Sequence, residues 1–247
     1  MSEPLSVSER PTSDLQDAVR LLLLIHTASE PVGSPEPPDA PPTAVAVLRS
    51  QVLLQKLDFW LRNPDYLANE LLSRYERDGN IEDLDLAEEI LSSEEPEARR
   101  YPMLRYLFGA YEPLDAALAI LAVPGLVLQR RRRRGEGRPQ RDYYLLAQGR
   151  AVAERIVSDV PELDYYVERT RLVVELAEGR RGSELRDIQY LQEEYANTAH
   201  GERIGGIAAR ARSRLAELRG SQGGGTEDSA AEAGLASLAT LSSEETP

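Results

Sequence analysis

Apolar side chains recur at spacings of three and four residues in several parts of the chain, the pattern of one buried face of an α-helix. A capping box begins at Ser13, and the apolar positions after it predict a helix to about residue 28. Six prolines between residues 29 and 42 predict an extended linker, because proline cannot continue a helix. A second helical stretch is predicted over residues 45–77, with a break at Asn63-Pro64.

The helical period continues through the middle of the chain and then changes. Short helices are predicted over residues 82–95, 97–108 and 114–121. The first is strongly acidic but lacks the glycine turn and ligand spacing of a calcium loop, so it is interpreted as a solvated face. Residues 126–128 and 142–146 have the character of short strands around a turn rich in Gly and Pro, and they predict a β-hairpin.

Helical periodicity returns after the hairpin, with helices predicted over residues 148–159, 163–178, 183–195 and 202–218. Residues 220–247 contain five carboxylates and no basic side chain, and they are rich in Gly, Ser and Ala. Such a composition cannot bury enough apolar surface to offset its ordering entropy, so a disordered acidic tail is predicted. The fold class expected is mainly α with one β-hairpin.

The order of three helices, a two-stranded hairpin and a further helix is that of a winged helix-turn-helix core with additional C-terminal helices. Several short segments, taken in order, resemble the prokaryotic winged-helix proteins of the YwgA type, related to SocA-like antitoxin domains. The resemblance covers about residues 45–200 and implies a DNA-binding or antitoxin-like role without catalysis. The segments that carry it are LQKL at 54–57, FGAYEPL at 108–114, LAILAVPGLV at 118–127, YYLLAQGR at 143–150 and LRDIQYLQEEYANT at 185–198.

Four regions follow from these patterns. Residues 1–44 form an N-terminal helix with its proline-rich linker, residues 45–160 the winged-helix domain, residues 161–219 a C-terminal helical region, and residues 220–247 the tail. The C-terminal region holds more amphipathic helix than a minimal winged helix needs. Such helices often pair between two copies of a chain, which favours a homodimer.

The amino-acid composition excludes several classes of catalytic and metal-binding site. The chain has no cysteine and only two histidines, His26 and His200. Thiol catalysis, cysteine-ligated zinc and histidine-based triads or metal sites are therefore not expected, and no nucleophile and base can be paired from the motifs. We expect no enzyme activity, no cofactor and no metal. Without an apolar run of ~18 residues, we also expect no membrane association and a cytoplasmic location.

Charge is distributed unevenly. The formal net charge is −13, yet residues 129–150 sum to +6, because eight arginines meet only two carboxylates there. Crowded guanidiniums repel one another, and phosphates would relieve the repulsion through planar, bidentate contacts. The hairpin is thus predicted to bind the phosphate backbone of DNA; an acidic surface of a partner or of this chain, or no binding role at all, remain alternatives. The candidate contacts are Arg130, Arg131, Arg132, Arg133, Arg134, Arg138 and Arg141, with Arg99, Arg100 and Arg105 on the preceding helix as auxiliary candidates.

The predicted helix before the hairpin argues against sequence readout. Recognition helices present Arg, Lys, Asn or Gln to base edges in the major groove. Residues 112–121 contain none of these, and their only charged side chains are Glu112 and Asp115. We therefore expect a DNA-associated regulator that binds through its wing with weak sequence specificity. The alternative is a protein-interaction module, antitoxin-like or an accessory subunit, whose basic hairpin docks an acidic partner.

Overall fold

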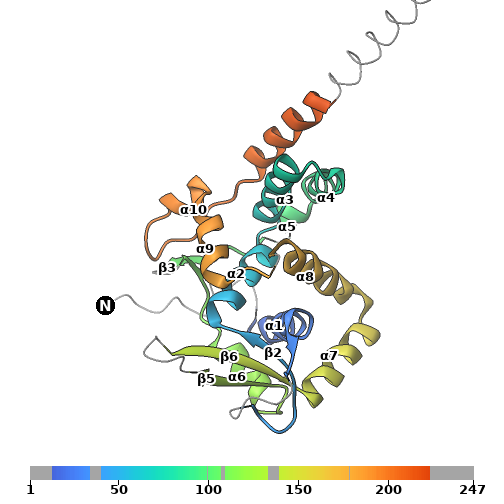
Figure 1. Ribbon diagram of the computed structural model, residues 1–247, viewed down its shortest axis with the longest axis vertical. Coiled ribbons are helices and arrows are strands. Elements are labelled where there is room, and N and C mark those ends of the chain that lie inside the picture. Colours follow the sequence, from blue (N-terminus) through green and yellow to red (C-terminus); the bar gives the residue numbers. More distant parts are fainter. Residues whose placement is uncertain are drawn as a thin grey trace, which may run out of the picture.

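The computed structural model describes residues 13–33, 40–98, 100–106, 109–132, 139–177 and 179–222. Within these residues the chain is mainly helical with a small antiparallel sheet, as predicted, and a second sheet has two short strands. Figure 1 shows the larger sheet at one end of the molecule and the C-terminal helix at the other. One continuous cluster of buried apolar side chains joins the elements between them.

Helix α1 (Asp14–Ala28) lies at the centre of the core. The predicted capping box forms: the Ser13 hydroxyl accepts a hydrogen bond from the Gln16 amide, and the Gln16 side chain accepts one from the Ser13 amide at 2.8 Å. The middle of α1 is fully buried, and it packs against α6 (Asp115–Ala122) and α8 (Asp164–Ala177). The N-terminal helix is therefore an integral part of the core.

The larger sheet has four antiparallel strands in the order β1-β2-β6-β5. These are β1 (Glu30–Pro31), β2 (Ala44–Arg49), β5 (Val127–Arg132) and β6 (Gln140–Leu146). Strands β5 and β6 form the predicted hairpin. Strand β2 contradicts the prediction of a helix that begins at residue 45.

Strand β2 forms because it can pair with the central strand β6. Val47 lies opposite Tyr144 and Leu48 opposite Tyr143, and all four side chains are buried. The pairing joins residues nearly a hundred positions apart, which a local pattern of apolar spacings cannot reveal. The chain then turns at Ser50, whose φ of 82° is unusual for a residue other than glycine, and enters the next helix.

Helices α2 (Gln51–Arg62) and α3 (Pro64–Asp78) meet at the predicted break, with proline in the first turn of α3. Helix α4 (Ile81–Ser92) packs against α3. Two hydrogen bonds from the Arg74 guanidinium to the buried carboxylate of Asp83, at 2.6 and 2.5 Å, tie these helices together.

The helix predicted over residues 97–108 is wrong. Helix α5 (Glu95–Ala98) is a single turn, and it is followed by extended chain with the short strands β3 (Leu104–Tyr106) and β4 (Gly109–Tyr111). The backbone before and within β3 exchanges hydrogen bonds with residues 201–204. These long-range bonds replace the local bonds that a helix would have made.

The elements α1, β2, α2, α6, β5 and β6 follow one another in this order along the chain, and β2, β6 and β5 are adjacent in the sheet. Residues 63–113, called the insertion below, lie between α2 and α6 in the sequence. In the winged helix that the sequence predicts, α6 would be the recognition helix and the β5–β6 hairpin the wing, and the hairpin is called the wing below.

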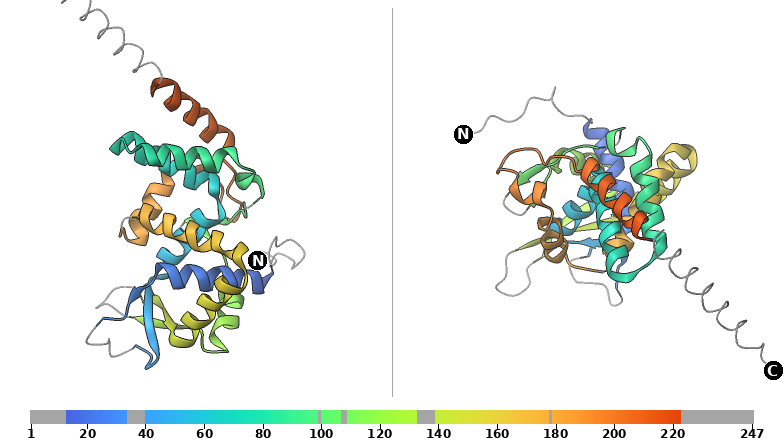
Figure 2. Two further views of the ribbon diagram at one scale, coloured as in Figure 1. Left: turned by 90° about the vertical axis from the view of Figure 1, so that its right-hand side faces the viewer. Right: turned by 90° about the horizontal axis from the view of Figure 1, so that it is seen from above.

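The C-terminal helices cover the core and then lead away from the sheet (Figure 2). They are α7 (Ala147–Asp159), α9 (Gly182–Tyr190), α10 (Glu193–Asn197) and a last helix over residues 208–222, besides α8. The last helix was predicted to begin at residue 202. It starts six residues later because the preceding segment pairs with β3. Most of the predicted tail, residues 223–247, lies outside the described residues.

Buried ion pairs fasten α1 to α2. Arg20 donates from Nε to Asp58 at 2.8 Å and from Nη1 to Asp17 at 2.5 Å. Arg62 lies 3.7 Å from Asp58 and 3.2 Å from Glu112, at the end of the insertion. Because each of these guanidiniums is buried, losing both of its carboxylate partners would leave a desolvated charge without compensation.

Candidate nucleic-acid interface

The register of the hairpin sorts the candidate arginines by face. Arg130 lies opposite Asp142, and Arg131 lies opposite Arg141. Opposite residues of an antiparallel pair share a face, so Arg130 and Arg132 lie on the Asp142 face and Arg131 lies with Arg141 on the other. Four candidates fall outside the described residues: Arg133, Arg134, Arg138 and the auxiliary Arg99.

Arg132 is bound to its own chain. Its Nε donates to Oδ2 of Asp142 at 2.5 Å, and its Nη2 donates to Oδ1 at 3.3 Å. The Asp142 carboxylate is fully buried, accepts a further hydrogen bond from the Ser50 amide at 3.3 Å, and lies 3.8 Å from Nη1 of Arg49. Arg132 therefore ties β5 to β6 next to the turn of the hairpin.

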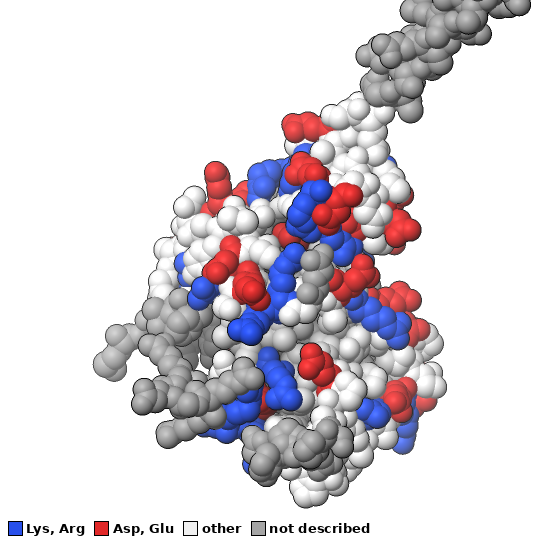
Figure 3. Space-filling model, in the orientation of Figure 1, with Lys and Arg blue, Asp and Glu red and all other residues white. Residues whose placement is uncertain are grey.

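Arg130 and Arg131 remain directed to solvent. Both are exposed, and neither forms an ion pair with a carboxylate of the described residues. Figure 3 shows basic side chains at the hairpin end of the molecule, whereas basic and acidic side chains alternate over the helices above it. The hairpin thus presents cationic groups that form no ion pair with the carboxylates of the described residues.

Arg141 is intermediate between these two cases. It is half-buried at the edge of the wing, and its Nη1 lies 3.9 Å from the Asp115 carboxylate in the first turn of α6. The Asp115 side chain is 84% exposed, so water screens this pair. The contact links the wing to α6 without sequestering Arg141.

The outer face of α6 has no hydrogen-bond donors for base edges. Ile120 is 38% exposed, and Val123, directly after the helix, is 89% exposed. Ala119 and Ala122 are exposed as well, and Asp115 is the charged residue of α6. An acidic and apolar surface of this kind is unsuited to direct readout in a major groove.

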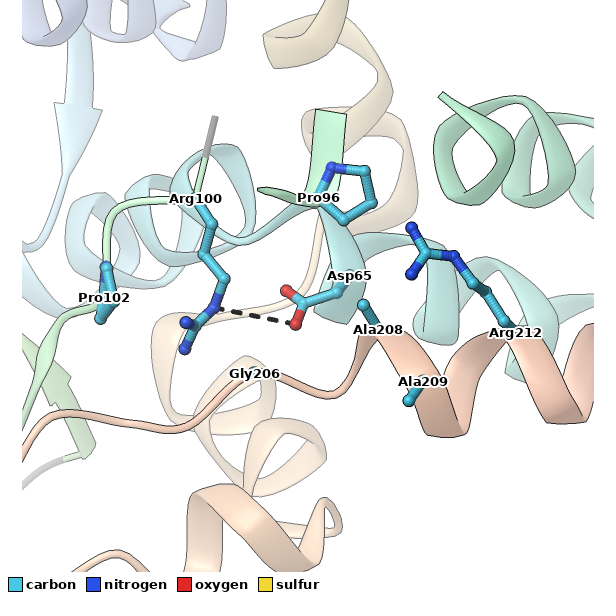
Figure 4. Close-up of a pocket in the computed structure, with 8 residues that line it drawn as sticks. All are labelled: Asp65, Pro96, Arg100, Pro102, Gly206, Ala208, Ala209 and Arg212. Carbon is cyan, nitrogen blue, oxygen red and sulfur yellow. Dashed lines mark ion pairs between the residues drawn. The ribbon is translucent and has the colours of Figure 1, made fainter. Parts of the chain in front are cut away.

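The auxiliary candidate Arg100 faces inward, as Figure 4 shows. Its Nη2 donates to the Ile204 carbonyl at 2.6 Å, and its Nε lies 3.8 Å from the buried Asp65 carboxylate. Asp65 accepts a hydrogen bond from the Ile207 amide at 2.6 Å, just before the last helix. Arg212 of that helix donates to a backbone carbonyl of α4 at 2.8 Å. These groups border a cavity of about 540 Å³, and their contacts hold the C-terminal helix in place.

The other described auxiliary, Arg105, lies on β3 and not on a helix. Its guanidinium carbon is 4.6 Å from the ring centroid of Tyr190, and its Nη1 donates to the Tyr106 carbonyl at 2.5 Å. Arg105 therefore contributes to packing between β3 and the C-terminal helices.

A second cavity contains a residue to which the sequence analysis gave no role. Lys56, the only lysine in the chain, lies on α2 and is 1% exposed. It borders a cavity of about 320 Å³ together with Arg141 and Asp115. The available signal was a single lysine inside the apolar run of a helix, where a buried ammonium has to be accommodated.

Other site types find no support in the described part of the chain. No group of three His, Asp or Glu side chains there could hold a metal ion. No helix there is long and apolar enough to cross a membrane. Comparisons of the chain with protein-family models, with curated proteins and with solved structures found no match. The geometry of the wing and of the cavities is therefore the basis for the proposals below.

Proposed function

We propose that this protein is a winged-helix DNA-associated regulator whose wing binds the phosphate backbone. The observation that supports the proposal is a difference among the arginines of the hairpin. Asp142 binds Arg132, whereas Arg130 and Arg131 are exposed. The pair between Arg132 and Asp142 ties β5 to β6 next to the turn, and the exposed guanidiniums of Arg130 and Arg131 are available for bidentate phosphate contacts. Backbone contacts position a protein on DNA without reading its sequence.

The composition of α6 limits specificity in this proposal. Its exposed face offers Asp115 and apolar side chains where a recognition helix would carry donors. The affinity for DNA is therefore expected to vary little with DNA sequence and to fall as the salt concentration rises. Neutralising four to six phosphates predicts a slope of roughly −4 to −5 in a plot of log affinity against log salt.

An electrophoretic shift assay with random-sequence duplex across a salt series tests the proposal. The double variant Arg130→Gln/Arg131→Gln should reduce the slope by about 1.8, because each phosphate contact contributes about 0.9. A matched control, Arg155→Gln/Arg171→Gln, removes the same charge from exposed positions on α7 and α8 and should leave the slope unchanged. Equal losses in both double variants would show that net charge alone governs binding.

The second candidate function is a protein-interaction module. The exposed Ile120 and Val123 beside the wing favour it, because a partner could cover this apolar surface while its acidic groups meet Arg130 and Arg131. Absence of any duplex binding at ~50 mM salt would select this alternative, since phosphate contacts are strongest at low salt. A light-scattering mass of the same sample tests the predicted homodimer.

A further inference from the structure

The cavity beside Lys56 lies where four parts of the fold meet. Its walls come from the first turns of α2, the strands β3 and β4, the start of α6 and the end of β6 nearest the turn. Its volume of about 320 Å³ is at the lower end of the range for small-molecule pockets, roughly 300–1,000 Å³. Val52, Ala110 and Tyr111 supply apolar surface to the walls. The size suits a compact metabolite with a flat apolar part.

Lys56 is the buried charged donor that borders the cavity, and the fully buried Tyr195, which does not line the cavity, lies behind it. Lys56 Nζ donates to the Tyr195 hydroxyl at 3.1 Å, and the Ala110 amide donates to the same oxygen at 2.5 Å. The phenolic O–H has no acceptor among the described residues, and two of the three ammonium N–H groups of Lys56 have none either. Lys56 and Tyr195 therefore have donor groups for which the described residues supply no acceptor.

Close packing of the backbone holds these donors in place. Gly109 has a φ of +98° and sits directly against them. A Cβ at this position would overlap the Tyr195 hydroxyl and lie 2.6 Å from Lys56 Nζ. Glycine thus leaves room for the ammonium at the cavity wall. Glu112, at the far end of β4, is fixed to α2 by two hydrogen bonds with Gln55, at 2.7 and 3.0 Å.

The charges around Lys56 are unbalanced. Burial, followed by the positive charges of Arg186 on α9 and Arg105 on β3, lowers the pKa of Lys56 to about 7. The carboxylate that borders the cavity, Asp115, is paired with Arg141 at 3.9 Å, and Lys56 forms no ion pair within the described residues. When Lys56 is protonated, it is therefore a buried cation without a counter-charge among the described residues.

We propose that this cavity binds a small organic monocarboxylate, whose carboxylate accepts hydrogen bonds from Lys56. One negative charge balances the one unpaired buried cation, whereas a phosphate dianion would bring an excess charge into a buried site. The apolar walls receive the rest of the ligand. The ligand would lie against Arg141 and Asp115, at the junction of wing and α6, but the proposal does not depend on DNA binding.

The single lysine makes a direct test possible. Full-length protein labelled with lysine carrying ¹³C at Cε gives one side-chain signal, which belongs to Lys56. Benzoate is the probe, and benzylamine, of similar shape but opposite charge, is the matched control ligand. Benzoate should move the signal toward its ammonium position with a dissociation constant of about 1 mM or below. Its affinity should fall about tenfold per pH unit above the pKa of Lys56, because only the ammonium attracts the carboxylate.

Two variants separate a binding role from a structural one. Lys56→Met keeps the length of the side chain and should weaken benzoate binding at least tenfold. Tyr195→Phe removes the hydroxyl behind Lys56 and no part of the cavity wall, so it should weaken binding less than Lys56→Met does. Arg155→Gln, on exposed α7, should bind as the wild type does. The proposal is overturned if benzoate up to about 20 mM leaves the Lys56 signal unmoved, if benzylamine binds as well as benzoate, or if the affinity does not change with pH. The first two results need no variant, so a misfolded variant cannot obscure them.

Discussion

Replacing Asp142 by Asn tests whether a buried carboxylate anchors the wing. Removing one partner of a fully buried ion pair costs roughly 3–5 kcal/mol. Asp142 is fully buried, but the Arg132 and Arg49 side chains are 18% and 40% exposed and regain some hydration. The Asn side chain also keeps one oxygen for the Ser50 amide. We therefore expect the free energy of unfolding to fall by about 2–3 kcal/mol, because surface-screened pairs contribute less than buried ones.

Urea unfolding, monitored by circular dichroism, measures this loss. An unchanged dependence of the unfolding free energy on urea concentration would show that the folded state is otherwise preserved. In a double-mutant cycle, Arg132→Gln combined with Asp142→Asn should lose less than the sum of the two single losses. Arg130→Gln, on the same strand but exposed, is the control and should cost less than about 0.5 kcal/mol. A loss below that value for Asp142→Asn, or strictly additive losses in the cycle, would refute the anchoring role.

Three further predictions concern the interior and the C-terminal helix. The pKa of Lys56 falls from 10.5 to about 7 on folding, so the unfolded chain binds more protons between these pH values. Stability of the wild type relative to Lys56→Met should therefore rise with pH over this interval, by on the order of 5 kcal/mol, in urea titrations at a series of pH values; a flat difference would contradict a buried lysine. In Gly109→Ala the added Cβ would overlap the Tyr195 hydroxyl, and alanine would have to adopt a φ of +98°. The melting temperature in calorimetry should therefore fall by at least 10 °C, which corresponds to a few kcal/mol. An unchanged melting temperature would mean that the backbone there is not held as described. Asp65→Ala removes the acceptor for the Ile207 amide and should speed hydrogen exchange at the start of the last helix by about five- to thirtyfold, equivalent to 1–2 kcal/mol. Asp65→Asn keeps an acceptor oxygen and should restore most of the protection.

Much of the helical framework could be predicted from local periodicity. The capping box at Ser13, the break at Asn63 and the hairpin over β5 and β6 each depend on neighbours within a few residues, and the structure confirms all three. Strand β2 was missed because its partner β6 lies far away in sequence. Strand β3 pairs with the nearby β4 and also bonds to residues 201–204, and only the second of these contacts is distant in sequence. Their residues carry no local signal that outweighs the helical spacing around them.

Some features of the candidate site could likewise be predicted from the sequence, whereas others depend on the tertiary structure. The sequence by itself determined that a cluster of guanidiniums interrupts an acidic chain and that the helix before it lacks base-reading donors. Only the tertiary structure decided which charges are available: Asp142 neutralises Arg132, Asp65 draws Arg100 inward, and the fold buries Lys56 beside a cavity. The physical reason is that charge and periodicity are properties of the chain, whereas desolvation and pairing arise only when distant segments meet.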